Sequence, residues 1–397
     1  MSLLKDHDLL IIAPSFPSED DSFIGGVFIK NQVAELKRFF NKITVISPVF
    51  RSFGYVKKDK ACKDYSYDNV EVNFPRCFYI PISWLNKVVI DGRTRVVKRT
   101  IDKQNIHFNL IHAHFTWPSG YIAAKLRQQY HVPVLTTVHE NTDWLDREIK
   151  MNHPYLKMAW SGANILIRVN KKDVKALKHF NESTVAIPNG FSPSFHPMDT
   201  TMAREKLALP IGAKIIFSLG LLRERKGFDY LINAMTSVCE HRNDILCYIG
   251  GSGVEYDRLK EQINQLHLES SVKLLGRVPG DQLPLWMNAC DVFTLPSLSE
   301  GNPTVMFEAL GCGKPFIGTR VGGVPEVITS DEYGLLVEPG SSSDLAEKLL
   351  SALGRQWDRE AIVQYAQQYT WENVSRELVQ QYRQALGSPP SDVNDFH

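Results

Sequence analysis

Two series of short apolar runs, each run followed by a stretch of helical periodicity, constrain this fold more than any other feature of the sequence. Each run has the length of one buried strand. Strands that alternate with helices in this way predict a parallel sheet with helices on both faces. The chain of 397 residues exceeds the ~150 residues of an average domain. The sequence therefore predicts an α/β protein made of two doubly wound, Rossmann-like domains.

A loop rich in Pro, Asn and Gly at residues 188–197 separates the two series. We expect an N-terminal domain at 1–190, a C-terminal domain at 191–370, and a final helix with a polar tail at 371–397. In the first domain, strands are expected at 8–14, 43–47, 110–114, 134–138, 165–169 and 184–187, and a helix at 27–40. In the second, strands are expected at 214–219, 245–249, 272–275, 292–295, 315–318 and 334–337, with helices at 227–239, 255–266, 283–289 and from 303. Residues 342–386 are expected to be helical.

Charge and hydropathy argue against several classes of protein. The net charge of +1 does not favour nucleic-acid binding. The longest apolar runs, such as residues 215–222, are far shorter than the ~20 residues of a membrane span. The first ten residues lack the apolar core of a signal peptide, so a cytoplasmic protein is expected. The six cysteines form no C-x-x-C pair and have no histidine cluster beside them, which favours reduced thiols and no metal.

The two halves of the chain differ in charge. Residues 1–190 carry 27 Lys and Arg against 18 Asp and Glu, a net +9, and residues 191–397 carry 18 against 26, a net −8. A basic half predicts a surface that meets an anionic partner. Its densest part alternates cations with apolar residues at helical spacing, which indicates either a membrane-surface helix or the solvated face of a soluble domain. The cations are Lys87, Arg93, Arg95, Lys98, Arg99 and Lys103.

Two loops in the second half have features of an anion site. The segment GLLRERKG, residues 220–227, precedes an expected helix, whose free N–H groups and dipole favour an anion. Arg223, Arg225 and Lys226 add positive charge, so this is either a diphosphate clamp or a charged surface turn. The segment GGSG, residues 250–253, allows close backbone approach to a ligand at Gly251, but a simple tight turn explains it equally well. No complete G-x-G-x-x-G occurs, which disfavours a nicotinamide-dependent dehydrogenase.

The strongest motif is SEGNPTVMFEA, residues 299–309. Pro303 suits the first turn of a helix, so the N–H groups of Thr304 and Val305 would be available to a diphosphate. Glu300 could accept hydrogen bonds from sugar hydroxyls, and Glu308 from the two hydroxyls of a ribose. The alternative for Glu308 is a charge that interacts only with the helix dipole.

This segment resembles the E-x7-E motif of the retaining glycosyltransferases of family 4, with Glu300 and Glu308 as its two acids. The resemblance extends over roughly residues 8–386 and includes EALGCGKP at 308–315, GGVPE at 322–326, IPNG at 187–190 and FHP at 195–197. It implies the GT-B fold, in which two Rossmann-like domains face each other. It also implies a last helix, opening near Trp371, that crosses back to the N-terminal domain.

The resemblance assigns further residues to the site. It implies that Lys226, Glu300, His139 and Arg223 lie at the reaction centre, and that His114 and Asn141 lie on the acceptor side. Packing or hydrogen bonding within the fold is the alternative for His114 and for its neighbour His112. The donor is expected against Gly25, Gly26, Arg225, Gly251, Val278, Asn302, Pro303, Thr304, Val305 and Glu308.

The implied reaction moves a hexosyl group from a UDP- or GDP-sugar to a glycan, glycolipid or lipid-linked acceptor. It proceeds with retention and without a metal or other cofactor. Lys226 and a neighbouring Arg would stabilise the charge that develops on the leaving diphosphate. The family commonly has Arg directly after the glycine at 220, where this chain has Leu221, so Arg223 or Arg225 is expected to supply that charge.

Two other classes fit part of the sequence. An epimerase of nucleotide sugars can share the two-domain fold, and a non-catalytic nucleotide-sugar-binding protein would tolerate Leu221. The presence of Lys226, Glu300 and Glu308 favours the transferase over both. Because the N-terminal domain is basic, we expect an anionic or membrane-bound acceptor and peripheral association with the inner face of a membrane; a soluble acceptor is the alternative.

Overall fold

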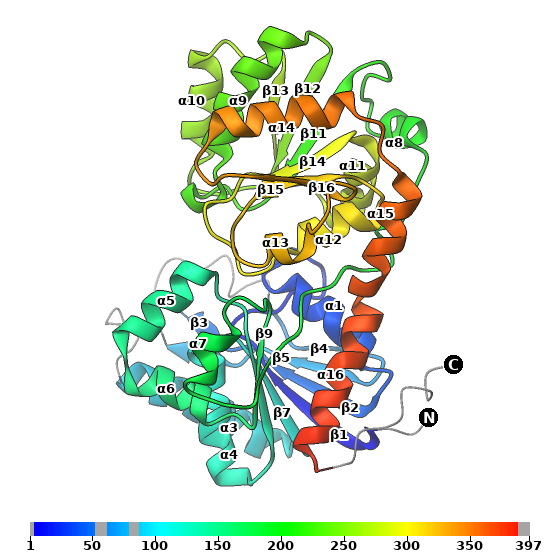
Figure 1. The fold of residues 1–397 in the computed structure, drawn as a ribbon. Helices are drawn as coiled ribbons and strands as arrows, with labels where there is room; N and C mark the ends of the chain where they lie inside the picture. Colours follow the sequence, from blue (N-terminus) through cyan, green and yellow to red (C-terminus); the bar gives the residue numbers. More distant parts are fainter. Residues whose placement is uncertain (1–3, 52–61, 79–86, 388–397) are drawn as a thin grey trace. The chain divides into compact units, whose positions relative to one another are not determined.

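The computed structural model describes residues 4–51, 62–78 and 87–387, and the chain divides into two units. Unit 1 holds the described residues up to Pro188 and the final helix from Trp371, and unit 2 is Asn189–Thr370 (Figure 1). Each unit is built on a parallel sheet, as expected for both halves. The polar tail expected after residue 387 lies outside the described residues.

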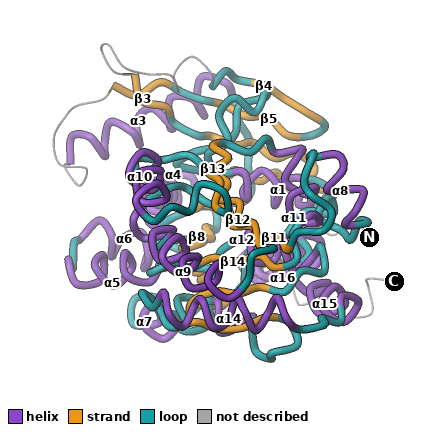
Figure 2. The backbone as a smooth tube through the Cα atoms, turned by 90° about the horizontal axis from the view of Figure 1, so that it is seen from above, coloured by secondary structure: helices purple, strands orange, loops and turns teal. Residues whose placement is uncertain are grey.

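The sheet of unit 1 has eight strands in the order β10-β9-β8-β7-β1-β2-β5-β4. All neighbours pair in parallel except β4 and β5, an antiparallel pair at one edge. Figure 2 shows β4 and β5 side by side. Two more short strands, β3 and β6, pair separately. The strands are β1 (Leu4–Ile12), β2 (Phe40–Ile46), β3 (Val49–Arg51), β4 (Tyr65–Tyr67), β5 (Val70–Asn73), β6 (Arg76–Phe78), β7 (Leu110–His114), β8 (Val134–Val138), β9 (Ile165–Arg168) and β10 (Thr184–Ala186).

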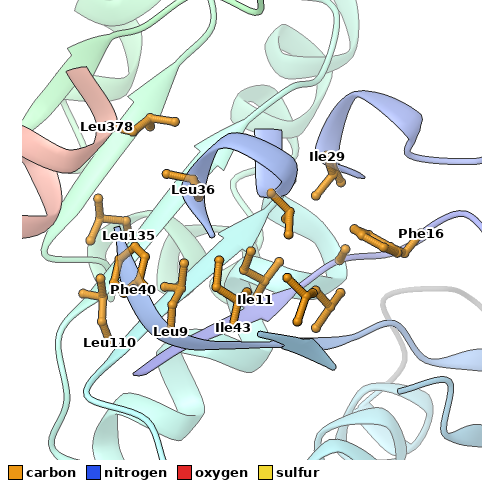
Figure 3. Close-up of a cluster of buried hydrophobic side chains, with 14 of the residues drawn as sticks. Leu9, Ile11, Phe16, Ile29, Leu36, Phe40, Ile43, Leu110, Leu135 and Leu378 are labelled. Carbon is orange, nitrogen blue, oxygen red and sulfur yellow. The ribbon is translucent and has the colours of Figure 1, made fainter. Parts of the chain in front are cut away.

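Helices cover both faces of this sheet. On one face α1 (Val27–Leu36) and α16 (Trp371–Ala385) pack over strand residues such as Leu9, Ile43 and Leu135 (Figure 3). On the other face α3 (Lys87–Gln104), α4 (Tyr121–Tyr130) and α6 (Pro154–Ser161) enclose a second core. The connections also contain the helical turn η1 (Thr116–Gly120), α5 (Thr142–Met151) and α7 (Val174–Lys178).

The last helix belongs to the first unit. Its apolar residues recur every three or four positions, which places them on one face. Trp371, Val374, Leu378 and Tyr382 are all buried in the core that α1 covers. The expected return of the last helix to the N-terminal domain is thereby confirmed.

Unit 2 has an all-parallel sheet in the order β13-β12-β11-β14-β15-β16. Its strands are β11 (Lys214–Leu219), β12 (Ile245–Gly250), β13 (Val272–Gly276), β14 (Val292–Leu295), β15 (Phe316–Thr319) and β16 (Gly334–Val337). One face is covered by α9 (Phe228–His241), α10 (Tyr256–Gln265) and α14 (Ser342–Gly354). The other is covered by α11 (Leu283–Ala289), α12 (Thr304–Gly311) and α15 (Arg359–Ala366). Shorter elements are α8 (Thr200–Lys206), η2 (Glu224–Lys226), η3 (Gly280–Gln282), α13 (Val324–Val327) and η4 (Gln367–Tyr369).

Several details differ from expectation. The first strand, expected at 8–14, is Leu4–Ile12, because its pairing with β2 already starts at Leu4. The helix expected to reach residue 40 ends at Leu36, because Phe40 already starts β2. The segment 342–386 contains three α-helices, because Asp358 caps α15 by accepting from the N–H of Ala361 and Thr370 forms a β-bridge with Phe191. The strands β3 to β6 were not expected, since runs of three or four residues have too little periodicity to be recognised.

The basic stretch of unit 1 forms helix α3. Arg95, Arg99 and Lys103 are exposed on it, while Val97 and Ile101 are buried in the core. The side chain of Lys87 lies outside what the structure describes. Within the described ranges, α3 and every other helix are too short or too polar to cross a bilayer.

Candidate functional site

A buried ion pair joins two loops at the carboxyl end of the unit 2 sheet. Lys226 follows β11, Glu300 follows β14, and Lys226 Nζ lies 2.5 Å from Glu300 Oε1. Ser297 Oγ donates to the same oxygen at 2.7 Å. Burial by itself would raise the pKa of Glu300, but the charges of Lys226 and Arg225 outweigh it, so the pKa lies below its usual value. Glu300 is therefore ionised and holds Lys226 at the edge of the sheet.

The two arginines of the loop after β11 differ in their surroundings. Arg225 is half-buried, donates to the carbonyl oxygen of Ser299 at 3.2 Å and lies 3.7 Å from Glu300 Oε2. Arg223 is exposed. Leu221, at the position where the family commonly has Arg, is 54% exposed. The structure thus brings Arg225, and not Arg223, beside Lys226 and Glu300.

Glycines set the path of the loops around this pair. Gly227, with φ 66°, ends η2 and starts α9, and a Cβ there would lie 2.1 Å from the carbonyl oxygen of Pro296. Gly251, with φ 142°, approaches the carbonyl oxygen of Gly220 so closely that a Cβ would lie 1.8 Å from it. Both contacts are with the protein's own backbone. Gly251 therefore packs the loop after β12 against the loop after β11.

Helix α12 starts directly after the ion pair. Pro303 precedes its first residue, so the N–H groups of Thr304 and Val305 belong to the first turn and have no partner further back in the helix. Glu308 lies in α12, eight positions after Glu300 in the sequence. Burial raises the pKa of its carboxyl group to about 7. A carboxyl group with this pKa changes its charge at neutral pH.

Two other expected donor residues are engaged inside unit 2. The Oδ1 atom of Asn302 accepts from the N–H of Asn189 at 3.0 Å, and Asn189 Nδ2 donates to the carbonyl oxygen of Asn302 at 2.7 Å. This pair ties the start of unit 2 to the motif. The side chain of Val278 is buried, 2.8 Å from where a Cβ on Gly250 would be. Two residues of this site were not expected: Asn189, in the linker, and Ser297, in the loop after β14. The I-P-N-G segment could have indicated Asn189, but no sequence pattern indicated Ser297.

In unit 1, two histidines at the carboxyl ends of neighbouring strands form a hydrogen-bonded pair. His114 Nδ1 and His139 Nε2 are 3.0 Å apart, and the rings are stacked. Burial holds the pKa of both well below the usual range, so both are neutral. His112 is bonded to Tyr382 Oη at 2.6 Å and Thr137 Oγ1 at 2.8 Å, which is the packing role left open for it.

Elements on either side position His139. Gly25 and Gly26 lead into α1, whose Phe28 ring centre lies 4.8 Å from that of His139. Phe115 follows β7, and its ring centre lies 5.0 Å from that of His139. Asn141, expected on the acceptor side, caps α5, because its Oδ1 accepts from the N–H of Trp144 at 3.0 Å.

A group of buried charged residues beside His139 was missed by the sequence reasoning. Arg168 is fully buried and pairs with Asp173, whose Oδ2 lies 2.5 Å from Arg168 Nη2. Glu140 and Glu148 are buried as well. Charged residues are common on surfaces, so their sequence positions carried no signal of burial.

The chain contains one Asp-x-Asp triplet, Asp6-His7-Asp8. It lies in β1, and Asp8 Oδ1 accepts from Asn41 Nδ2 at 2.8 Å. The N–H of Asp8 donates to Asn109 Oδ1 at 2.8 Å. Asn41 is the second residue of β2 and Asn109 directly precedes β7, so these contacts lie at the amino ends of both strands, away from His114 and His139. The described parts of the chain hold no cluster of three or more His, Cys, Asp or Glu side chains that could bind a metal.

Comparison with known proteins gives two matching family models. Residues 25–195 match the model described as Glycosyltransferase Family 4. Residues 199–369 match the model described as Glycosyl transferases group 1. Together the two matches extend over most of both units.

Individual proteins are similar over most of their length. TuaC of Bacillus subtilis (strain 168), named as a teichuronic acid biosynthesis glycosyltransferase, is 29% identical over 341 residues, which are 82% of this chain and 84% of that protein. Sucrose-phosphate synthase of Thermosynechococcus elongatus has a TM-score of 0.75 at 20% identity, over 96% of this chain and 99% of that chain. HepE of Anabaena in complex with UDP-glucose has a TM-score of 0.73 at 19% identity, over 95% of this chain and 100% of that chain.

Proposed function

This chain belongs to the family 4 glycosyltransferases, the glycosyl transferases of group 1, and has their GT-B fold; on that premise we propose that it transfers a hexosyl group from a nucleotide-diphosphate sugar, with retention and without a metal. Family membership supplies the enzyme class. The donor, the stereochemistry and the acceptor are the content of the proposal. The observation that carries it is the buried pair of Lys226 and Glu300 at 2.5 Å, next to the first turn of α12.

The proposed chemistry assigns a role to each group in unit 2. The bond between the anomeric carbon and the β-phosphate oxygen breaks, and negative charge develops on the departing diphosphate. Lys226, Arg225 and the first N–H groups of α12 stabilise that charge, as a metal does in other enzymes. Glu300 keeps Lys226 in position and accepts from a hydroxyl of the transferred sugar.

The bond to the acceptor forms on the same face of the sugar. The acceptor oxygen attacks the anomeric carbon, and its proton passes to the departing phosphate, so the step balances without a protein nucleophile. His139, neutral and fixed by His114, hydrogen-bonds to a hydroxyl of the transferred sugar. Arg225 is assigned to the diphosphate in place of the arginine that Leu221 replaces.

The donor is tested by thermal unfolding with a panel of nucleoside diphosphates and nucleotide sugars, with and without EDTA. We favour UDP, since HepE is similar in fold and has been solved with UDP-glucose. A ligand at 100 times its Kd adds ~2.7 kcal/mol to the free energy of unfolding, so UDP is expected to raise the unfolding temperature equally with and without EDTA. A shift that requires a divalent cation would overturn metal independence, and no shift with any nucleotide would overturn the donor site.

The pKa of Glu308 predicts a pH-dependent affinity for the nucleotide. Its pKa of about 7 in the free protein means that the carboxylate form, which accepts from both ribose hydroxyls, is lost as the pH falls through 7. The affinity for UDP is therefore expected to fall from pH 8 to pH 6, approaching tenfold per pH unit below the pKa. Titration calorimetry measures it. Glu308→Gln, which cannot ionise, should bind more weakly at pH 8 and show a flat profile; a wild-type profile in this variant would exclude the role.

The acceptor is proposed to be anionic or carried by a membrane lipid. Helix α3 of unit 1 exposes Arg95, Arg99 and Lys103, and basic residues near an anionic surface contribute ~1 kcal/mol each. Vesicles with anionic lipid are expected to retain the protein at low salt and release it at high salt. Charge reversal of these three residues should abolish retention while leaving UDP binding intact. Retention by neither kind of vesicle would favour a soluble acceptor, and equal retention by neutral and anionic vesicles would exclude the role of the basic residues of α3.

A further inference from the structure

Two carboxyl groups of unit 1 are buried beside the loop that carries His139. Glu140 follows this histidine directly, and Glu148 lies on α5; their exposed fractions are 7% and 1%. Glu140 Oε1 accepts from the N–H of Thr116 at 2.8 Å, and Glu148 Oε1 accepts from Trp144 Nε1 at 2.9 Å. The Oε2 atom of each is buried and has no hydrogen-bond donor among the described residues.

The charges around this pair do not balance if both groups are ionised. Arg168 is the buried cation there, and its Nε and Nη2 already bind Asp173 Oδ2, at 3.1 and 2.5 Å. Its Nη1 donates to the carbonyl oxygens of Val138, at 2.8 Å, and of Glu140, at 2.6 Å. The neighbouring His114 and His139 are neutral, because burial lowers the pKa of both. One of the two glutamates therefore has no counter-charge, and buried carboxyl groups in this position take up a proton.

We propose that Glu148 is protonated, that its hydroxyl donates to Glu140 Oε2, and that this shared proton holds the His139 loop in its active position. A single proton satisfies both unpartnered oxygens, since the protonated group supplies a donor and the ionised group an acceptor. Burial raises the pKa of Glu140 as well, but the N–H of Thr116 and the nearby Arg168 oppose this effect by stabilising its negative charge. We therefore take Glu140 as the ionised member of the pair. Both glutamates are then positioning residues. This role rests on the proposed transfer reaction, whereas the existence of the shared proton does not depend on that reaction.

The geometry shows what the shared proton would fix. Thr116 follows β7 and Glu140 follows β8, so the carboxylate of Glu140 joins the two loops that carry His114 and His139. The hydroxyl of Thr116 accepts from Trp160 Nε1 at 3.0 Å, which anchors the first loop in the core. Glu148 joins α5 to the same point. A side chain displaced by ~1 Å from the reacting groups can cost ~10²-fold in rate.

The pKa of Glu148 gives the window in which the proton is held. Burial, and then the charge of Glu140, raise it to about 9, against the opposing effects of Trp144, Thr116 and Arg168. Between the ordinary glutamate pKa and about 9, the folded protein keeps a proton that the unfolded chain releases. Unfolding at pH 8 therefore releases this proton, and stability falls as the pH rises through this window.

Infrared difference spectra test the proton without any substrate. At pH 8 the wild type is expected to show the carbonyl band of a protonated carboxyl group that Glu148→Gln lacks. Glu182→Gln, which changes an exposed glutamate of unit 1, should keep the band. The band should disappear in the wild type above about pH 9, and Glu148→Gln should release one proton fewer on unfolding at pH 8. Identical spectra for the wild type and Glu148→Gln would overturn the shared proton.

Kinetics test the positioning role. In the wild type, kcat is expected to decline above about pH 9, where the shared proton is lost. Glu148→Gln keeps a donor toward Glu140 and Glu140→Gln keeps an acceptor for Thr116, so both should retain kcat within ~3-fold and show no such decline. Glu140→Ala removes the link between the two loops and should lower kcat ~10²-fold, with the Kd for UDP unchanged. The assay is run well below the unfolding temperature of this variant. Wild-type kcat in Glu140→Ala would overturn the role. If Glu140→Ala does not fold, a wild-type pH profile in both Gln variants would overturn it.

The same measurements separate this inference from the proposed function. If the wild type binds no nucleotide and transfers no sugar, the proposed function fails, while the infrared band still decides whether the proton is shared. If UDP binds and sugar is transferred but the band is absent, the inference fails alone.

Discussion

Replacement of Lys226 by Ala is expected to lower kcat by ~10²–10³, the loss seen when one preorganised donor to a developing negative charge is removed. Lys226 Nζ lies 2.5 Å from a buried glutamate, so its position is set before any ligand binds. A cation that needs no rearrangement stabilises the departing diphosphate at full strength. The measurement is steady-state turnover at saturating donor.

This variant also leaves Glu300 buried without its cation, and the two effects must be separated. Lys226→Ala combined with Glu300→Gln removes both charges, so it should recover stability but not kcat. Lys260→Ala, which changes an exposed lysine on α10, should behave as the wild type. If Lys226→Ala raises KM and leaves kcat unchanged, Lys226 binds the donor but does not stabilise the transition state.

Replacement of Arg168 by Met is expected to destabilise the protein by ~3–5 kcal/mol, the cost of breaking a buried ion pair from one side. The guanidinium is fully buried and bonds Asp173 and the carbonyl oxygens of Val138 and Glu140. Its removal leaves the carboxylate of Asp173 buried without this cation, although Thr142 Oγ1 and Asn170 Nδ2 still donate to it, and takes one donor from each of the two carbonyl groups. Urea unfolding followed by circular dichroism measures the loss.

The control for Arg168 is Arg147→Met, an exposed position on α5 that should change stability by less than ~0.5 kcal/mol. Arg168→Met combined with Asp173→Leu removes both charges and should recover part of the loss. A loss below 1 kcal/mol in Arg168→Met would mean that the carboxylate finds other partners, and the charge balance used for Glu140 and Glu148 would no longer hold.

The sheets were predictable where strands are buried on both faces. The strands at 110–114, 134–138, 214–219, 292–295 and 334–337 begin and end where the sequence predicted. A continuous apolar run bounded by polar or turn residues marks such a strand without reference to the rest of the fold. The short strands β3 to β6 lack such runs, and only pairing makes them strands: β3 with β6, β5 with β2, and β4 with its neighbour β5.

The candidate site was predictable in kind but not in arrangement. The motif from Ser299 to Ala309 and the cation cluster before α9 predicted an anion site with two acids, and the structure places Lys226 and Arg225 beside Glu300. They left the choice between Arg223 and Arg225 open. Two side chains that are only two residues apart in a turn can point in different directions, and here Arg223 is exposed while Arg225 lies against Glu300. Asn141 and Asn302 were expected to meet ligands, and the structure shows each bonded to the backbone of its own unit.

The sequence by itself determined the α/β class, the family and the enzyme class, and it supplied the residues that we propose for a diphosphate site, because periodicity and motif spacing are local properties of a chain. Tertiary structure alone decided which charges are buried together. Glu140 meets Thr116 and Lys226 meets Glu300 only because parallel strands align their carboxyl ends at one edge of a sheet. Once water is excluded there, proximity sets which groups hold protons, and no local pattern in the sequence records it.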